Sequence, residues 1–485
     1  MLGAEAHVRE KNIPVLLIVW LLACDAPSAN DAGALPDAAS PSDAGPSLDA
    51  GAADGGGGAD SGASDGGILA ECRAPAPFDE GVTYARTLHV APGGTGDGTP
   101  AQPFGSIGDA ARAAEPGTRV LVAPGTYGAV SVSDLHGTPG APIAIVADGE
   151  VVIDGGAGVA LALTDPAYVV IEGFTLRAGI HGMNIDDGGS YDTPAHHLIL
   201  RDITIASAGS GGNNDCIKMS GVDDFWILGS DIAGCDRGEI VDMVGCHRGI
   251  IAGNSFHEPI GNGVQAKGGS SDTLITGNLF TRIPGRAVNA GGSTGLEYFR
   301  PLDAPYEAAR IRVIANVFVQ NGMESGAAVA FVGCDACVFA HNTVIEPRTW
   351  VARILQESTD ARFVPSRNGV FANNIVLLRM ADLRTFFNVG AGTAPETFRF
   401  ERNLWYALDR DASWTGPTYG DGLSPEIDPI IQEDPRFEDA AGGDYHLAAG
   451  SPALGAGRAL SVPLPPDYDG RCYADPPSLG ALEAR

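Results

Sequence analysis

The chain has 485 residues, 44% of them hydrophobic, so it is long enough to bury the core of one large domain with extensions. Its 60 acidic side chains outnumber its 30 basic ones, which gives a formal net charge of −30 at pH 7. Such an acidic protein is repelled by the phosphates of nucleic acid, so we expect no nucleic-acid partner.

The first 24 residues are predicted to be an export segment. Arg9 and Lys11 precede an apolar stretch over residues 13–23 that is too short to be a good membrane span. The stretch ends in Leu-Leu-Ala-Cys24, which resembles the lipobox of bacterial lipoproteins and implies that Cys24 is lipidated. We therefore expect an exported protein, lipid-anchored to the bacterial cell envelope or surface. An ordinary signal peptide or an uncleaved anchor is the alternative.

Residues 25–75 are predicted to be a disordered linker. As far as about residue 70 the sequence is almost entirely Ala, Gly, Ser, Pro and Asp, with eight Asp and no Lys or Arg. Such a composition cannot bury a core, so we expect a self-repelling, extended tether. Without these eight Asp the net charge is still about −22, so the remainder of the chain is also acidic.

A short sequence motif centred on Asn occurs six times between residues 254 and 403. It occurs at Asn254, Asn278, Asn316, Asn342, Asn374 and Asn403. The first step is 24 residues, about one coil of a parallel β-solenoid, and self-similarity at such a period indicates stacked units. We expect each Asn to hydrogen-bond to the copies above and below it, at the ~4.8 Å spacing of paired strands.

Residues 89–99, a short helical run over 109–114 and residues 120–127 resemble the opening of secreted right-handed β-helix proteins of the pectate-lyase-like superfamily. The resemblance implies an all-β, right-handed parallel β-helix over residues 76–430, with the short helix capping its open end. Residues 431–485 resemble the closing segment of many bacterial members. The resemblance identifies a fold and not a reaction.

Polar residues recur on one side of the predicted coils. Aligning the coils by their corner residue places Cys216, Ile240, Val264 and Val288 inward. Asp215 and Glu239 then stack outward, with Gln265, Asn289 and Lys267 beside them in a polar stripe. Lys218 and Asp242 share another column, which we interpret as an internal salt bridge.

A long excursion interrupts the coils over residues 291–310. The step from Asn278 to Asn316 is 38 residues, against 24 for the step before it. Long loops on a rigid scaffold often carry binding sites, although a surface insertion without function is the alternative. The predicted substrate-binding residues in and near this region are Gln265, Asn289, His257, Glu258, Glu307 and Arg353.

Within the superfamily, the resemblance suggests polysaccharide lyases, which split uronic-acid polymers by β-elimination. That chemistry needs a cation to neutralise the sugar carboxylate and a basic side chain to remove the adjacent proton. Calcium, a hard cation, would take oxygen ligands, and the predicted ones are Asp215, Glu239 and Asp242. Lys267 is the predicted base, and Arg286 or Arg300 would hold a carboxylate through its bidentate fork.

The segment around Glu239 resembles the alginate and chondroitin lyase branch, in which acidic calcium ligands precede a basic pair. The sequence departs from that pattern at Val244 and Gly245, which stand where a basic residue is expected. Two other functions therefore stay open. One is hydrolysis by paired acids, Asp215 with Glu239 or Glu258. The other is a non-catalytic, glycan-binding or adhesive surface lipoprotein.

The expected partners are a polysaccharide and, through Cys24, a membrane, and we expect a monomer. The net negative charge would repel a polyuronate unless cations bridge the two or the site is locally basic. Among the remaining cysteines, Cys334 and Cys337 could close a small loop, and Cys216, Cys235 and Cys246 are candidates for pairing or for burial. Cys72 and Cys472 have no obvious partners in the sequence.

Overall fold

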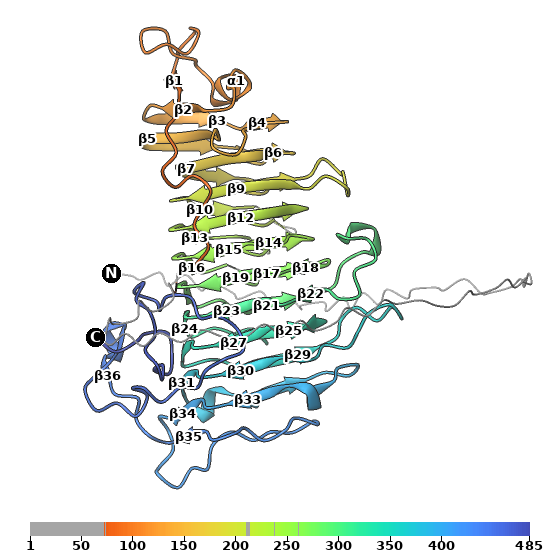
Figure 1. Ribbon diagram of the computed structural model, residues 1–485, viewed down its shortest axis with the longest axis vertical. Helices are drawn as coiled ribbons and strands as arrows, with labels where there is room; N and C mark the ends of the chain where they lie inside the picture. The colour runs from red at the N-terminus through yellow and green to blue at the C-terminus, as the bar shows by residue number, and fades with distance from the viewer. Residues whose placement is uncertain (1–71, 73, 210–213, 237, 260) are drawn as a thin grey trace, which may run out of the picture. The chain divides into compact units, whose positions relative to one another are not determined.

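The computed structural model describes residues 72, 74–209, 214–236, 238–259 and 261–485, and these form a parallel β-solenoid (Figure 1). The predicted right-handed β-helix is confirmed. Cys24, the export segment and most of the predicted linker lie outside the described residues. Within the described part of the chain, no helix is long and apolar enough to cross a membrane.

Each coil of the solenoid contributes strands to three faces. The first face contains β1 (Arg86–Val90), β2 (Thr118–Val122), the first parts of β5 (Ile143–Asp154) and β7 (Ala167–Ala178), β9 (Ala195–Arg201), β12 (Val222–Leu228), β15 (Ile250–Ala252), β19 (Leu274–Thr276), β23 (Arg312–Ile314), β27 (Val338–Ala340), β30 (Val370–Ala372) and β33 (Arg399–Glu401). The second face contains β3 (Gly125–Gly128), the later parts of β5 and β7, β10 (Thr204–Ala208), β13 (Asp231–Ala233), β16 (Ser255–His257), β20 (Leu279–Thr281), β24 (Val317–Val319), β28 (Thr343–Ile345), β31 (Ile375–Leu378), β34 (Leu404–Ala407) and β35 (Ile430–Ile431). Because β5 and β7 run through both faces, the two faces are joined in one 22-stranded sheet.

The third face is a separate ten-stranded parallel sheet. It contains β4 (Val130–Ser133), β6 (Leu161–Thr164), β8 (Met183–Asp186), β11 (Ile217–Ser220), β14 (Val241–Val244), β17 (Val264–Lys267), β21 (Arg286–Gly291), β25 (Ala327–Val332), β29 (Trp350–Leu355) and β32 (Phe387–Val389). Between this face and the next coil lie the short strands β18 (Ser270–Ser271), β22 (Ala308–Ala309) and β26 (Cys334–Asp335). The excursion between β21 and β22 projects from the stack in Figure 1 and contains the 3-10 helix η1 (Leu296–Tyr298).

A short helix covers the first coil. Helix α1 (Ile107–Arg112) starts two residues before the predicted 109–114, because the Ser106 side chain accepts a hydrogen bond from the Asp109 N–H at 3.2 Å and caps the helix. Its Ile107, Ala110 and Ala111 side chains are buried in the main core. The helix thus lies where the resemblance implied, at the open end of the solenoid.

The Asn ladder is confirmed. Asn278 Oδ1 accepts from the backbone N–H of Asn254 at 3.0 Å and from its side-chain amide at 2.9 Å, and the same pattern continues to Asn403. Glu426 ends the ladder by accepting both donors of Asn403 through Oε1. Beside the ladder a buried aromatic stack fills the interior, with neighbouring ring centroids 4.8 to 5.3 Å apart. Its members are Phe256, Phe280, Phe318, Phe339 and Phe371.

The closing segment follows the last coil. It contains an antiparallel pair, β36 (Phe437–Asp439) and β37 (Asp444–Leu447), and the 3-10 helix η4 (Ala440–Gly442). Two more 3-10 helices, η2 (Met380–Asp382) and η3 (Pro395–Thr397), precede it in the last coils.

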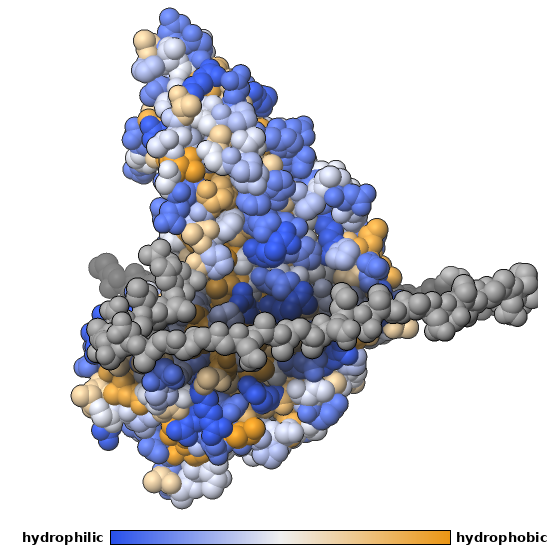
Figure 2. Space-filling model, in the orientation of Figure 1, coloured by the Kyte–Doolittle hydropathy of each residue, from blue (hydrophilic) through white to orange (hydrophobic). Residues whose placement is uncertain are grey.

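Disulfide bonds join Cys216 to Cys235, Cys334 to Cys337 and Cys72 to Cys472, and Cys246 is buried as a free thiol. Most of the face seen in Figure 2 is hydrophilic.

The pairing of Cys72 with Cys472 was not foreseen from the sequence. These residues are 400 positions apart, but both ends of the folded chain return to the outside of the solenoid. Near the N-terminal end, Phe78 packs against Trp226 of the first face, and near the C-terminal end Tyr473 packs against Ile314. Packing on one scaffold brings the two cysteines together.

Candidate functional site

The candidate site lies on the third face, where successive strands place polar residues side by side. Lys218 of β11 pairs in register with Asp242 of β14, which pairs with Gln265 of β17. The alignment made from the sequence is wrong by one residue at this point, since Val264 pairs with Val241 and not with Ile240. The reason is coil length: 24 residues separate Lys218 from Asp242, but only 23 separate Asp242 from Gln265.

Two lysines share one buried carboxylate in this register. The Lys218 Nζ lies 3.3 Å from Asp242 Oδ2 and 3.1 Å from Asp215 Oδ2, and Lys267 Nζ lies 3.0 Å from Asp242 Oδ1. The predicted salt bridge between Lys218 and Asp242 is therefore present. Burial alone would raise the pKa of Asp242, but the two ammonium groups outweigh it and lower that pKa. Likewise, the charges of Asp215 and Asp242 raise the pKa of Lys218 against the effect of its own burial.

Glu239 lies next to this network, and its carboxylate is only partly hydrogen-bonded. Its Oε1 accepts from Asn262 at 3.1 Å, but its buried Oε2 has no hydrogen-bond partner among the described residues. Burial, followed by the nearby charges of Asp242 and Asp215, raises the pKa of Glu239 to about 7. Glu239 thus titrates near neutral pH.

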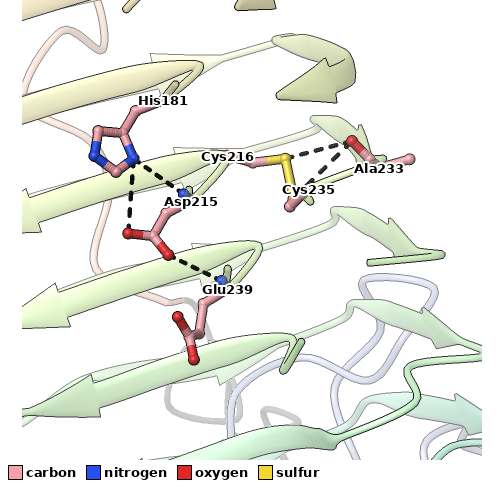
Figure 3. The surroundings of a disulfide bond; sticks show 6 residues. All are labelled: His181, Asp215, Cys216, Ala233, Cys235 and Glu239. Atoms are coloured by element: carbon pink, nitrogen blue, oxygen red, sulfur yellow. Dashed lines mark hydrogen bonds and ion pairs between the residues drawn. A yellow bond between two sulfur atoms is a disulfide. The ribbon is translucent and has the colours of Figure 1, made fainter. Parts of the chain in front are cut away.

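A row of polar groups on successive coils surrounds Asp215. Figure 3 shows His181, Asp215 and Glu239 one below another, with the disulfide of Cys216 and Cys235 beside them. His181 Nδ1 accepts from the Asp215 N–H at 3.0 Å, and Asp215 Oδ1 accepts from the Glu239 N–H at 2.9 Å. Asp215 is fully buried, so these contacts fix it from both sides.

The three predicted calcium ligands do come together. Asp215, Glu239 and Asp242 each offer an oxygen within 4.8 Å of the others. However, the oxygens of Asp215 and Asp242 already face ammonium groups and N–H donors, and only Glu239 Oε2 is free of them among the described residues. A calcium ion would have to displace Lys218, so this arrangement of donors does not fit the ion, and calcium binding stays a prediction.

A cavity of about 340 Å³ opens in front of the two lysines. It is lined by Lys218, Ser220, Asp242, Val244 and Lys267 from the strands and by Ser293, Thr294, Gly295, Tyr298 and Arg300 from the excursion. The predicted base and one of the two predicted arginines therefore share one cavity. The excursion forms its second wall. That this insertion builds a binding site stays a prediction.

Arg300 stands where the lyase pattern seemed to lack a basic residue. A Cβ atom on Gly245 would lie 2.5 Å from the Cβ of Arg300, so the arginine rests directly on this glycine. Arg300 forms a salt bridge with Asp187, which comes from the turn after β8. A positive charge therefore lies beside positions 244 and 245, and it comes from a loop that begins almost 50 residues later in the sequence.

Glu307 is placed as an anchor of the excursion. Its side chain is fully buried and accepts from the Gly268 N–H at 2.9 Å, from the Thr294 N–H at 3.0 Å and from the Thr294 hydroxyl at 2.8 Å. The Ser358 hydroxyl is a further donor to Glu307. Its contacts are therefore within the protein, and they hold the wall of the cavity in place.

A hydrogen-bonded row continues along the third face beyond the cavity. Gln265 donates to Asp242 at 3.1 Å, Asn289 donates to Gln265 at 2.6 Å, and Arg286 donates to Asn289 at 3.0 Å. Arg286 also pairs with Glu357 at 2.6 Å, and it does not line the cavity. Gln265, Asn289 and Arg286 are therefore hydrogen-bonded to the site through Asp242, but they do not line its cavity.

Three other predicted residues lie apart from the cavity. Arg353 is on β29, where burial and then the charge of Arg286 lower its pKa to about 10, and its guanidinium lies 4.4 Å from the centre of the Trp350 ring. His257 and Glu258 belong to the second face and the corner after it. There His257 pairs with Asp231, and Glu258 pairs with Arg282 at an exposed corner.

Several residues that line the cavity or contact its lining were not assigned to a site from the sequence. Tyr298 lies in the excursion that was identified as a whole, so its place in the loop was the only available signal. Asp187 follows β8 in an Asp-Asp-Gly-Gly turn and carries no mark of function by itself. Lys218, interpreted as half of a salt bridge, proves to line the cavity as well.

No protein-family model matches the chain, and no curated protein matches its sequence. Among solved structures it is similar to the pectate lyase Pel9A, with 17% identity and a TM-score of 0.50 over 84% of this chain and 98% of that one. It is also similar to the lacto-N-biosidase of Eubacterium ramulus (14% identity, TM-score 0.47, 71% of this chain and 68% of that one). A third similar structure is the surface adhesin PfbA of Streptococcus pneumoniae (11% identity, TM-score 0.44, 66% of this chain and 85% of that one). At such identities the likeness shows the fold alone, a parallel β-helix.

Proposed function

We propose that the protein is a polysaccharide lyase that cleaves a uronic-acid polymer by β-elimination in the cavity between the third face and the excursion. The observation that carries this proposal is the use of lysine. Of the 30 basic side chains only three are Lys, namely Lys11, Lys218 and Lys267. Lys218 and Lys267, the two lysines of the folded domain, both line this cavity. Lysine loses its proton far more readily than arginine, so among the three cationic side chains of the cavity the two lysines are the candidates for the base.

The cavity presents cations to its ligand although the protein is acidic. The carboxylates of Asp187, Asp215 and Asp242 are buried beneath Arg300 and the two lysines. An ammonium has three N–H donors and a guanidinium five. After their bonds within the described residues, two donors remain on Lys267, one on Lys218 and two on Arg300. A sugar carboxylate could satisfy several of them at once, which supports an anionic polymer as substrate.

The residues then take distinct roles. Lys267 acts as the neutral amine and removes the proton from the carbon next to the sugar carboxylate. The electron pair of that C–H bond forms a carbon–carbon double bond as the glycosidic carbon–oxygen bond on the neighbouring carbon breaks. The leaving oxygen takes a proton from water, and the product is an unsaturated uronide. Arg300 and Lys218 bind the carboxylate and stabilise the charge that develops on it. Lys218 suits this role because its two carboxylate neighbours keep it protonated.

Hydrolysis by paired acids is the second candidate, favoured by one observation. A carboxyl group with a pKa of about 7, such as Glu239, is what a general acid requires. Neither Glu239 nor Asp215 lines the cavity, however, so a substrate that binds there meets the lysines first. Glu258, the other acid considered, pairs with Arg282 at a corner outside the cavity.

The test is to incubate the protein with polygalacturonate, alginate and glycosaminoglycans, with and without calcium, and to follow the ultraviolet absorbance of the unsaturated product. We expect a rise that is lost in Lys267→Ala. Arg282→Ala, at the exposed corner, is the matched control and should keep full activity. Reducing sugar without new absorbance would favour hydrolysis. Retention on a polymer without any cleavage would favour the glycan-binding or adhesive protein.

We also propose that the protein is exported and tethered through a lipid on Cys24. The three disulfide bonds support an oxidising compartment, where such bonds persist. We expect labelled fatty acid to be incorporated into the full chain in a bacterial host and not into Cys24→Ser. Equal labelling of the two proteins would reject the lipid anchor.

A further inference from the structure

Two loops that are far apart in the sequence meet at the edge of the cavity. Asp187, in the turn after β8, is 113 residues from Arg300 in the excursion. Asp187 Oδ1 accepts from Arg300 Nη2 at 2.8 Å, and its Oδ2 accepts from Arg300 Nε. Tyr191, from the same turn, places its ring 4.4 Å from the guanidinium carbon and donates its hydroxyl hydrogen to the Glu297 carbonyl at 2.5 Å.

The coils beneath these loops are shaped to admit the pair. A Cβ atom on Gly221 would lie 2.1 Å from Asp187 Oδ2 and 2.5 Å from Arg300 Nε. One on Gly245 would lie 2.5 Å from the Cβ of Arg300. Both glycines have positive φ, +66° and +61°, at the turn that follows the strand of the third face. The salt bridge therefore lies in a groove that any side chain at these two positions would fill.

The salt bridge leaves one edge of the guanidinium available. Asp187 occupies the Nε and one Nη2 donor of Arg300, and the Tyr298 carbonyl accepts from Nη1 at 3.1 Å. Among the described residues no other acceptor reaches this side chain, so one donor remains on each terminal nitrogen. Both remaining donors can bond to the carboxylate of a ligand.

Holding the excursion does not require this arrangement, because Glu307 already fastens it. Four donors from Gly268, Thr294 and Ser358 converge on the Glu307 carboxylate at the base of the loop. A buried ion pair is also weak evidence for a gain in stability, because removing two charges from water opposes their attraction. What Asp187 adds is a single orientation of Arg300.

We propose that Asp187 and Tyr191 are positioning residues that hold Arg300 with its remaining edge toward the cavity, where it grips the carboxylate of a uronic-acid unit. This inference rests on the proposed function, since it assigns the residue that recognises the acidic sugar. Without Asp187 the guanidinium is still charged but is free to turn. Recognition of the carboxylate then weakens although all the groups that face the substrate are still present.

The test compares Asp187→Asn and Gly245→Ala with the wild-type full chain. We expect both variants to raise KM for the polyuronate about tenfold, with a smaller change in kcat. A variant that was merely less well folded would lower the apparent kcat and leave KM unchanged. Asp187→Glu keeps the charge, and we expect it to restore part of the affinity.

Gly253→Ala is the matched control. Gly253 has a φ of +68°, close to that of Gly245, but its added Cβ would have no neighbour nearer than 4.0 Å. It therefore imposes the same backbone strain without touching Arg300, and its KM should equal that of the wild type. A KM that rises equally in Gly245→Ala and Gly253→Ala would overturn the inference.

Binding is measured in parallel by retention on a polyuronate column and on a neutral polysaccharide column. We expect Asp187→Asn to lose retention on the polyuronate alone. If the wild type cleaves the polymer and Asp187→Asn matches it in KM and retention, the positioning role is wrong and the lyase stands. If the wild type neither cleaves nor binds any polyuronate, the proposed function itself fails, and this inference fails with it.

Discussion

Truncating one side chain in the middle of the Asn ladder should destabilise the solenoid strongly. Asn316 is fully buried, and its Oδ1 accepts from the Asn278 N–H at 3.0 Å and from the Asn278 side-chain amide at 2.9 Å. Its Nδ2 donates to the Ile275 carbonyl at 2.9 Å, to the Ile314 carbonyl and to Asn342. Asn316→Ala removes all of these bonds together.

The magnitude follows from the groups left behind. The Asn278 N–H loses its acceptor, and the Ile275 carbonyl loses a donor, both in the interior. An unsatisfied buried polar group costs about 1–3 kcal/mol, so the two together should lower the free energy of unfolding by about 2–6 kcal/mol. Asn368→Gly is the control, because Asn368 donates one hydrogen bond to Asp335 at an exposed corner and glycine tolerates its positive φ of +56°, where alanine would be strained. We expect that variant to lose less than about 1 kcal/mol.

The assay is guanidinium unfolding followed by circular dichroism, combined with hydrogen exchange of the backbone amides. Because coils contact only their neighbours, local opening is expected before global unfolding. The Asn278 amide should therefore lose protection in Asn316→Ala before the first coils do. If Asn316→Ala and Asn368→Gly were equally stable, the ladder would not carry the stability assigned to it.

Three further predictions concern the site. Glu239 has a folded-state pKa of about 7 against an ordinary value of 4.5, so its contribution to stability is present below about pH 4.5 and is lost as the pH rises to 7. The Gln side chain of Glu239→Gln cannot ionise. Between about pH 4.5 and 8 the free energy of unfolding of this variant, relative to that of the wild type, should therefore increase by up to about 3 kcal/mol. If the difference in free energy of unfolding between the two proteins did not change with pH, the raised pKa would be wrong. Acylation of amines should abolish lyase activity by modifying Lys218 and Lys267, and bound polyuronate should protect them; full activity after complete acylation, shown by mass spectrometry, would exclude Lys267 as the base. Since the ammonium groups occupy the carboxylates of Asp215 and Asp242, chelators should leave activity within about twofold; loss of activity that calcium restores would show that the ion displaces Lys218.

The residues that repeat along the chain could be interpreted from the sequence. The Asn ladder, the apolar interior and the capping helix follow from local patterns, because each coil contacts its immediate neighbours and repeats the same environment. The salt bridge between Lys218 and Asp242 was found in the same way, since 24 residues separate its members and one coil has that length. A change of a single residue in coil length was enough to misplace Ile240 against Val264.

The composition of the cavity was decided by contacts between distant segments. Asp187, Arg300 and the Cys72–Cys472 disulfide join parts of the chain separated by more than 100 residues, and none of them belongs to the repeat. Conversely, His257 and Lys267 are near in the sequence but lie on different faces. The sequence by itself therefore determined the solenoid and its stacked columns, because these depend on neighbouring coils. Only the tertiary structure decided which side chains share a cavity, because loops from different coils fold back over the same strand ends.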